Sequence, residues 1–240
     1  MSEARFSTLE ELRSHIGDCD RCGLAGARTN LVFGVGDPDA DLMFIGEAPG
    51  KNEDLQGEPF VGAAGKLLDE LLATIGLRRS QVYIANVLKC RPPGNRDPRP
   101  EEIQACTPFL EEQIRLIDPA VIVTLGNFAT KFVLQTTRGI TGLRGRLFRV
   151  GGRRVVPVFH PAAALYTPAK KDVLAEDFLR IGKVLAMPED ADRLPPPDPP
   201  QVSSVSAGQG AVRREAPSTG QGHAASEATH GDDGDDLTLF

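Results

Sequence analysis

The chain has 240 residues, of which 40% are hydrophobic and 25% are charged, a composition typical of a soluble globular protein. Its formal net charge is −6. Ten of the 33 acidic residues and three of the 27 basic residues lie in residues 189–240, so this segment has a net charge of −7. Residues 1–188 therefore have a net charge of +1. No apolar run is long enough to span a membrane, and the start, MSEARFSTLEEL, lacks the apolar core of a signal peptide, so we expect a cytoplasmic protein without membrane contact.

Residues 1–188 alternate between patterns typical of helices and patterns typical of strands. The first predicted helix opens with the capping box at residues 7–10 and ends near His15. Four strands are predicted after it, at 41–45, 82–88, 120–125 and 154–159. Each strand is followed by a predicted helix, at 63–75, 101–117, 127–134 and 171–185. This order predicts an α/β fold of three layers, α/β/α, around a four-stranded parallel sheet. Residues 189–240 are rich in Pro, Ser, Gly, Ala and Asp, and we expect a disordered acidic tail.

Polar residues stand at three of the predicted strand ends. Glu47 follows the first strand, Asn86 lies within the second, and His160 follows the last. Ligands of parallel α/β sheets bind beyond the carboxyl ends of the strands. The pattern therefore predicts a site in which these three side chains converge.

The stretch FIGEAPGKNEDLQGEPFVGAAG, residues 44–65, joins the first strand to the following helix. A strand, a glycine-rich loop and a helix usually indicate phosphate binding. This loop instead contains four carboxylates, which repel phosphate, and the chain has no G-x-x-x-x-G-K-[ST] motif. A nucleotide-binding α/β protein is therefore disfavoured.

Four cysteines lie in residues 1–188, and only the first two are closely spaced. Cys19 and Cys22 form a C-x2-C pair, whereas Cys90 and Cys106 are separated by fifteen residues. Zinc sites normally use two close pairs, while a [4Fe–4S] cluster takes four thiolates, so the spacing favours the cluster over zinc. Four unrelated buried thiols are the remaining alternative.

Several further motifs occur in a fixed order: GEAPG at 46–50, GEPFVGAAGKLL at 57–68, YIANVLKCRPPGNRDP at 83–98 and FHPAAAL at 159–165. Together with the cysteines, they resemble the iron–sulfur-containing uracil-DNA glycosylases of bacteria and archaea, usually called family 4. The resemblance covers roughly residues 8–185. It implies a uracil-DNA glycosylase that flips uracil out of single- or double-stranded DNA and hydrolyses its N-glycosidic bond, leaving an abasic site. It further implies a monofunctional, monomeric enzyme with residues 1–188 as the catalytic domain.

The resemblance also implies roles for single residues. A [4Fe–4S] cluster would be held by Cys19, Cys22, Cys90 and Cys106. The flipped uracil would lie against Gly46, Glu47, Ala48, Phe60, Asn86 and His160, with His160, Glu47 and Asn86 as the catalytic set. Where the best-known uracil-DNA glycosylases have an aspartate that orients the attacking water, this chain has Ala48, so Glu47 is the candidate for that task.

Each of these residues also has a structural interpretation. Asn86 within an apolar strand is equally consistent with a hydrogen-bonded core amide, His160 with a helix cap, and Phe60 with the core. The arginines of residues 91–99 suit phosphate contacts, or belong to an ordinary linker.

Two alternatives to an active glycosylase remain: a member that traps uracil-DNA covalently, and an iron–sulfur DNA-binding module without activity. The trapping relatives carry a histidine between the last two cysteines, and none is present between Cys90 and Cys106. Both Asn86 and His160 are present, which disfavours the inactive module.

The last five residues form a separate motif. They are Asp236, Leu237, Thr238, Leu239 and Phe240. They resemble the Q-L-[SD]-L-F peptide that bacterial proteins insert into the sliding clamp, with Asp in place of Gln. The alternative is an acidic tail that only improves solubility. A tail with one apolar tip is typical of a docking peptide.

Overall fold

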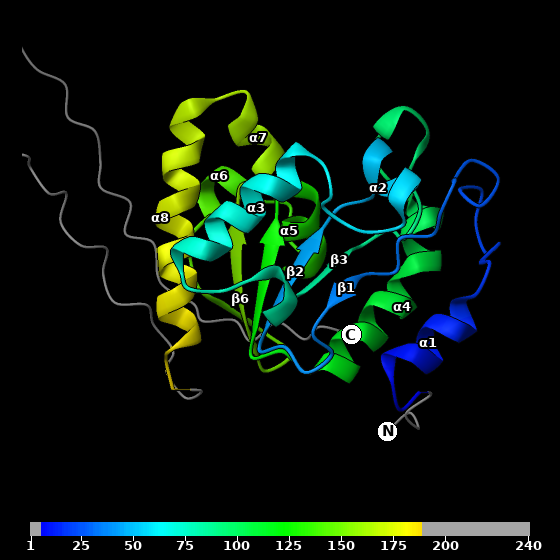
Figure 1. Ribbon diagram of the computed structural model, residues 1–240, viewed down its shortest axis with the longest axis horizontal. Helices are drawn as coiled ribbons and strands as arrows, with labels where there is room; N and C mark the ends of the chain where they lie inside the picture. Colours follow the sequence, from blue (N-terminus) through cyan, green and yellow to red (C-terminus); the bar gives the residue numbers. More distant parts are fainter. Residues whose placement is uncertain (1–5, 189–240) are drawn as a thin grey trace, which may run out of the picture. The chain divides into compact units, whose positions relative to one another are not determined.

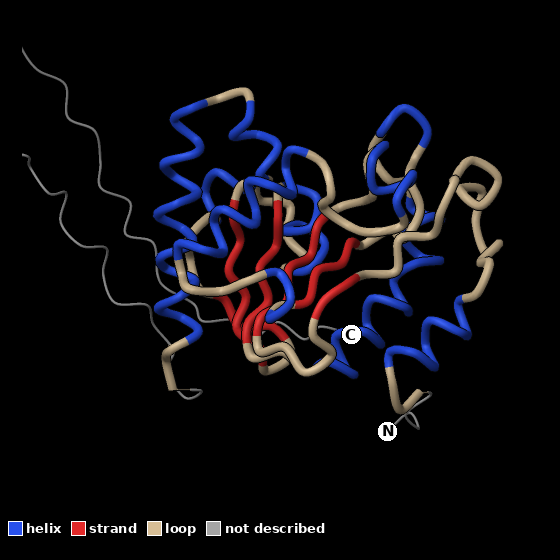
Figure 2. Tube along the Cα trace, in the orientation of Figure 1, coloured by secondary structure: helices blue, strands red, loops and turns tan. Residues whose placement is uncertain are grey.

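The computed structural model describes residues 6–188, which form a central sheet with helices on both faces (Figures 1 and 2). The predicted tail, 189–240, and its C-terminal peptide lie outside the described residues. None of the described helices has the length and apolar character needed to cross a membrane.

The sheet has six strands in the order β1-β3-β2-β4-β6-β5. The four inner strands are parallel: β3 (Tyr83–Asn86), β2 (Leu42–Gly46), β4 (Val121–Leu125) and β6 (Arg153–Val158). The edge strands β1 (Val35–Gly36) and β5 (Phe148–Val150) are antiparallel to their neighbours. The prediction of a sheet of four parallel strands was therefore wrong: the four predicted strands are the centre of a mixed sheet.

Alternating residues of the inner strands pack against two different layers of helices. Leu42 and Phe44 of β2 face α3 (Ala63–Thr74), α7 (Pro161–Leu165) and α8 (Pro168–Leu185). Met43 and Ile45 face α4 (Pro100–Ile117), α5 (Asn127–Val133) and α6 (Ile140–Leu143). These side chains are at most 1% exposed, which explains why the strand reads as a continuous apolar run.

The first helix, α1 (Leu9–Ile16), packs on α4 and begins one residue later than its capping box predicted. Thr8 is the N-cap: its side chain accepts a hydrogen bond from the backbone N–H of Glu11, and the Glu11 carboxylate accepts from the backbone N–H of Ser7. The N-cap bond of a capping box is thus present at Thr8, while the Glu11 carboxylate binds the N–H of the residue before the N-cap instead of the N-cap itself.

The glycine-rich stretch contains a helix that was not predicted, α2 (Lys51–Gln56). Short 3-10 turns occur at Arg79–Gln81 and Pro93–Asn95. In Figure 1 the four inner strands point toward the end of the sheet at which α2 and α7 lie, and the loops at this end build the candidate site.

Candidate functional site

A cavity of about 370 Å³ lies at the carboxyl ends of the inner strands. It brings together the three side chains that the strand-end pattern singled out, Glu47, Asn86 and His160. Ala48 and Phe60 belong to the same walls, and the other lining residues are Pro49, Gly50, Glu53, Ala64, Pro92, Asn95, Arg96 and Ala162. The predicted convergence is therefore confirmed as geometry, while the role of each residue stays a prediction.

Asn86 is the last residue of β3 and is 2% exposed. Its side-chain oxygen Oδ1 is buried and has no hydrogen-bond partner among the described residues. A buried acceptor without a partner is costly, about 1–3 kcal/mol, and such atoms in native proteins usually await a ligand or water. The structural interpretation of Asn86, a core amide with all its hydrogen bonds made, is therefore wrong.

Gly46 pairs with Asn86 in the register of the sheet and makes room for the site. A Cβ atom on Gly46 would lie 2.3 Å from Asn86 Oδ1 and 2.9 Å from Cε2 and Cζ of Phe60. Both distances are shorter than any normal contact. Only glycine at this position allows the amide and the phenyl ring to approach each other.

Phe60 has a left-handed backbone, with φ of 54°, which is rare for a residue with a Cβ atom. Its backbone is held from two sides. The Glu53 carboxylate accepts from the N–H groups of Val61 (3.0 Å) and Gly62 (3.2 Å), and Arg79 donates to the Phe60 carbonyl at 3.1 Å. These bonds compensate the strain and fix the ring, which is only 6% exposed, in the cavity wall.

His160 caps α7, and its ring stacks on Phe60 with 5.4 Å between ring centroids. Its Nδ1 accepts a hydrogen bond from the backbone N–H of Ala162 at 3.1 Å, so the proton of the neutral ring lies on Nε2. Burial lowers the pKa of His160 to about 4, although the nearby Glu53 carboxylate opposes the shift. The ring is therefore a neutral donor through Nε2 at physiological pH. The structural interpretation of His160 as a cap is also correct, since one nitrogen caps the helix and leaves the other available.

Glu47 is half-buried at the cavity, and burial together with the negative charge of Asp97 raises its pKa. The backbone carbonyl of Glu47 accepts from the N–H of Leu88 at 3.0 Å, which continues the pairing of β2 with β3 past the strand ends. This pairing fixes the loop that carries Glu47 and Ala48 next to Asn86.

The loop of residues 91–99 forms another part of the cavity wall. Arg96, one of the three arginines considered for phosphate contacts, donates to both carboxylate oxygens of the buried Glu102, which lowers the pKa of that carboxyl group. Arg91 donates to the side chain of Asn95 at 2.7 Å. Arg96 thus serves as an internal brace of the wall, which the sequence did not indicate.

The four cysteines are free thiols at one end of this region. Cys90 and Cys106 are buried and pack with Leu24 and Leu88, and Cys22 lies against the same cluster. Burial raises the pKa of Cys90 to about 11; Arg28 opposes this shift, and the charges of Cys106 and Cys22 add to it. Cys19 and Cys22 act in the same way on Cys106. The structure therefore brings all four thiols from distant segments within electrostatic reach of one another.

Among the described residues, no group of three or more His, Cys, Asp or Glu side chains meets the geometry of a single-ion site. Four thiolates without a histidine are a donor set that a [4Fe–4S] cluster takes.

Lys89 was not assigned to the site, yet it links Asn86 to the cysteines. Its Nζ is fully buried and donates to the Asn86 carbonyl (2.8 Å) and to Gln113 Oε1 (2.6 Å). Burial lowers its pKa to about 7, with the Cys106 and Cys90 thiolates opposing. The Lys89 side chain thus stabilises the backbone at the end of β3.

Sequence reasoning also missed the exposure of two apolar residues that follow His160 in the chain. Leu165 ends α7 and is 44% exposed, and Tyr166 follows it and is 87% exposed. Leu165 is the last residue of the FHPAAAL motif and Tyr166 follows it, but a sequence does not distinguish exposed from buried apolar residues.

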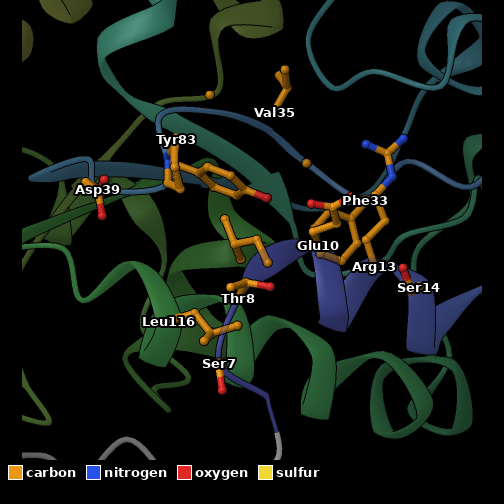
Figure 3. Close-up of a pocket in the computed structure, with 14 residues that line it drawn as sticks. Ser7, Thr8, Glu10, Arg13, Ser14, Phe33, Val35, Asp39, Tyr83 and Leu116 are labelled. Atoms are coloured by element: carbon orange, nitrogen blue, oxygen red, sulfur yellow. The ribbon is translucent and has the colours of Figure 1, made fainter.

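A larger hollow of about 920 Å³ lies elsewhere, between α1, the β1 edge and Leu116 of α4 (Figure 3). Tyr83, which lines this hollow, is the first residue of β3 and lies at the opposite end of the strand from Asn86. The Tyr83 hydroxyl is bonded by Gln113 at 3.2 Å. None of the residues that converge in the smaller cavity reaches this hollow.

Comparison with known proteins establishes the family of the chain. The sequence pattern of the uracil DNA glycosylase superfamily matches residues 33–180. The chain belongs to this superfamily. A type-4 uracil-DNA glycosylase of Archaeoglobus fulgidus is 48% identical over 188 residues, which are 75% of this chain and 94% of that protein. The type-4 enzyme of Sulfurisphaera tokodaii is 46% identical over 193 residues, an alignment that covers 77% of this chain and 88% of that protein. The type-4 enzyme of Thermotoga maritima is 47% identical over 163 residues, which covers 67% of this chain and 85% of that protein. The chain is thus a member of the type-4 family, as the ordered motifs predicted.

Proposed function

We propose that this protein is a monofunctional uracil-DNA glycosylase that flips uracil out of DNA and hydrolyses its N-glycosidic bond. Membership of the type-4 family supports the activity. The observation that carries it on this chain is the buried, unpaired Oδ1 of Asn86 in a cavity that also contains an aromatic face and a neutral histidine donor. Extruding a base costs a few kcal/mol, and the cavity has to recover that cost.

Asn86 reads the base. Uracil has a donor at N3–H and an acceptor at O4, and an asparagine carbonyl and amide match both. The free Oδ1 is the acceptor that N3–H requires. Cytosine presents the opposite pattern on the same edge, so the fixed orientation of Asn86 discriminates against it. Phe60 provides the aromatic face, and stacking of a base on such a ring is worth about 1–3 kcal/mol.

His160 stabilises the leaving group. Glycosidic cleavage produces an oxocarbenium-like sugar and a uracil anion with charge on O2. A neutral imidazole whose Nε2–H points at that charge lowers the barrier, and it does so without reorganisation because Nδ1 is already bonded to Ala162. Glu47 is the candidate for orienting the attacking water, and the raised pKa of its carboxyl group suits a base.

Leu165 and Tyr166 suit the gap left in the DNA stack. They project apolar surface from the C-terminal end of α7, the helix that His160 caps, and partial intercalation of such side chains stabilises unstacked DNA. Lys89, in turn, is unsuited to Schiff-base chemistry because its buried amine is already engaged by Asn86 and Gln113. The reaction therefore ends at the abasic site.

A [4Fe–4S] cluster on Cys19, Cys22, Cys90 and Cys106 completes the proposal. When bound, such a cluster supplies a covalent link among chain segments and a one-electron centre. Because Cys90 comes four residues after the end of β3, this link would hold the segment that follows Asn86. The monomeric state and the cytoplasmic location stay predictions from the sequence, as does the division into a catalytic domain and a tail.

The test is a cleavage assay on end-labelled oligonucleotides, single- and double-stranded, that contain one uracil. Uracil should be released from them, and strands should break only after alkali treatment. Strand breaks without alkali would overturn the monofunctional activity. A denaturant-resistant protein–DNA adduct in place of free uracil would instead establish the trapping alternative, and binding without release would establish the inactive module.

A further inference from the structure

Arg28 is a cationic side chain that contacts a cysteine sulfur. Its Nη1 donates to the backbone carbonyl of Cys19 at 2.5 Å and lies 3.5 Å from Sγ of Cys90, within the range of hydrogen bonds to sulfur. Two turns bring it there, closed by bonds from Ala25 N–H to the Cys22 carbonyl and from the Arg28 N–H to the Leu24 carbonyl. The guanidinium thus bridges the first and the third cysteine of the chain.

The backbone after Arg28 is anchored, so this contact is not that of a loose surface side chain. The N–H groups of Thr29 (2.8 Å) and Asn30 (3.4 Å) donate to Asp54 Oδ1, and the Asn30 side chain donates to the Asp54 carbonyl at 2.8 Å. Asp54 is 4% exposed and lies in α2, next to Glu53 of the cavity wall. The arginine is therefore held at the cysteines by the same helix that borders the base site.

We propose that Arg28 is a positioning residue for the iron–sulfur cluster, where it donates to the Cys90 sulfur and raises the reduction potential of the cluster. The inference rests on the proposed cluster. Arginine stays protonated in proteins, and hydrogen bonds to the sulfurs and net charge are established determinants of cluster potentials. When one electron enters the cluster, no bond breaks and the net negative charge on iron and sulfur grows by one unit. A fixed guanidinium stabilises that more negative state, and it also opposes loss of the Cys90 ligand.

Lys89 is a second cation beside these thiols, but it does not serve the same test. Its ammonium is bonded to Asn86 and Gln113, so replacing it would disturb the base site together with the cluster. Arg21 is a better control because it lies between Cys19 and Cys22 and carries the same charge. Its guanidinium bonds to the Ile16 carbonyl and lies over the ring of Phe109.

The experiment compares the anaerobically prepared full-length protein with its Arg28→Gln, Arg28→Lys and Arg21→Gln variants. Iron and sulfide content establish first whether a cluster is present, which tests the proposed cofactor separately. The midpoint potential of the one-electron couple is then measured by voltammetry, and cluster loss is followed by bleaching of the visible absorbance in a chelator.

We expect Arg28→Gln to make reduction about tenfold less favourable, which is 59 mV for a one-electron couple, and to bleach faster. Arg28→Lys should fall between wild type and Arg28→Gln, because the charge remains and the bond geometry is lost. Arg21→Gln should stay near wild type. If Arg28→Gln does not retain its cluster, the Arg28→Lys variant carries the comparison. Potentials and bleaching rates in both Arg28 variants that match those of Arg21→Gln would overturn the role, even with a full cluster present.

Discussion

Replacing His160 with alanine tests the proposed stabilisation of the leaving base. The change removes the Nε2–H donor from the cavity and leaves the Ala162 N–H without its cap. Loss of one preorganised donor to a developing anion costs about 3–4 kcal/mol, which is roughly two to three orders of magnitude in rate. Single-turnover release of uracil from a short oligonucleotide measures this step, because product release does not contribute.

The pH dependence of the same rate tests the protonation state. With a pKa of about 4, His160 is still about nine-tenths neutral at pH 5, so it should cause almost no fall in rate between pH 8 and pH 5. An ordinary histidine pKa near 6.5 would lower the rate roughly 30-fold over the same interval if the neutral form were the donor. The two cases are therefore easily separated.

His15→Ala is the matched control, because His15 is the other histidine of residues 1–188 and lies exposed on α1. It should keep the wild-type rate. A His160→Ala variant with an unchanged single-turnover rate would refute the role of His160. A rate that falls toward acid pH with a midpoint near 6.5 in the wild type but not in the His160→Ala variant would refute the lowered pKa of His160.

Four further predictions concern the base site, the metal and the tail. Asn86→Asp should slow uracil release about 100-fold or more, because a carboxylate cannot donate to O4; assays with uracil and cytosine substrates measure this, and a wild-type rate on uracil would remove Asn86 from the site. Gly46→Ala should abolish uracil binding with little loss of folding, because the new Cβ atom would lie 2.3 Å from Asn86 Oδ1. Gly142→Ala is the control, because a Cβ atom at Gly142 has no neighbour within 4 Å. Equal activity of the two variants would contradict the geometry. Metal analysis of anaerobically prepared protein should find four iron atoms per chain, whereas stoichiometric zinc without iron would contradict the cluster. Deletion of residues 236–240 should leave activity on short oligonucleotides intact and abolish binding to the host's sliding clamp, and calorimetry that detects no binding by the full-length protein would end the clamp hypothesis.

The inner sheet was predictable because burial on both faces leaves a clear pattern. The edge strands left none. β1 consists of Val35 and Gly36, and a Cβ on Gly36 would lie 1.9 Å from the Val82 carbonyl, so the strand forms because a side chain is missing. A two-residue strand with a glycine resembles a loop in any sequence pattern. β5 is likewise only three residues long and has arginine at its centre.

The candidate site divides in the same way. Glu47, Asn86 and His160 were predictable because parallel strands place their carboxyl ends side by side. The brace between Arg96 and Glu102, and the contact of Arg28 with Cys90, depend on how loops fold back onto the sheet. Such contacts follow from tertiary packing, and neither residue type nor spacing indicated them.

The glycine-rich loop now has a physical explanation that differs from phosphate binding. Its glycines make room for an aromatic ring: a Cβ on Gly46 would collide with the Phe60 ring, and a Cβ on Gly65 would lie 1.7 Å from the Phe60 carbonyl oxygen. The carboxylate of Glu53 accepts hydrogen bonds from the two backbone N–H groups that follow Phe60. In a phosphate-binding loop, such N–H groups would donate to the phosphate instead. These two N–H groups are therefore occupied by an acid of the loop itself. What it presents to the cavity is a rigid phenyl face beside an unpaired amide oxygen, and these two groups suit a flat base with a polar edge.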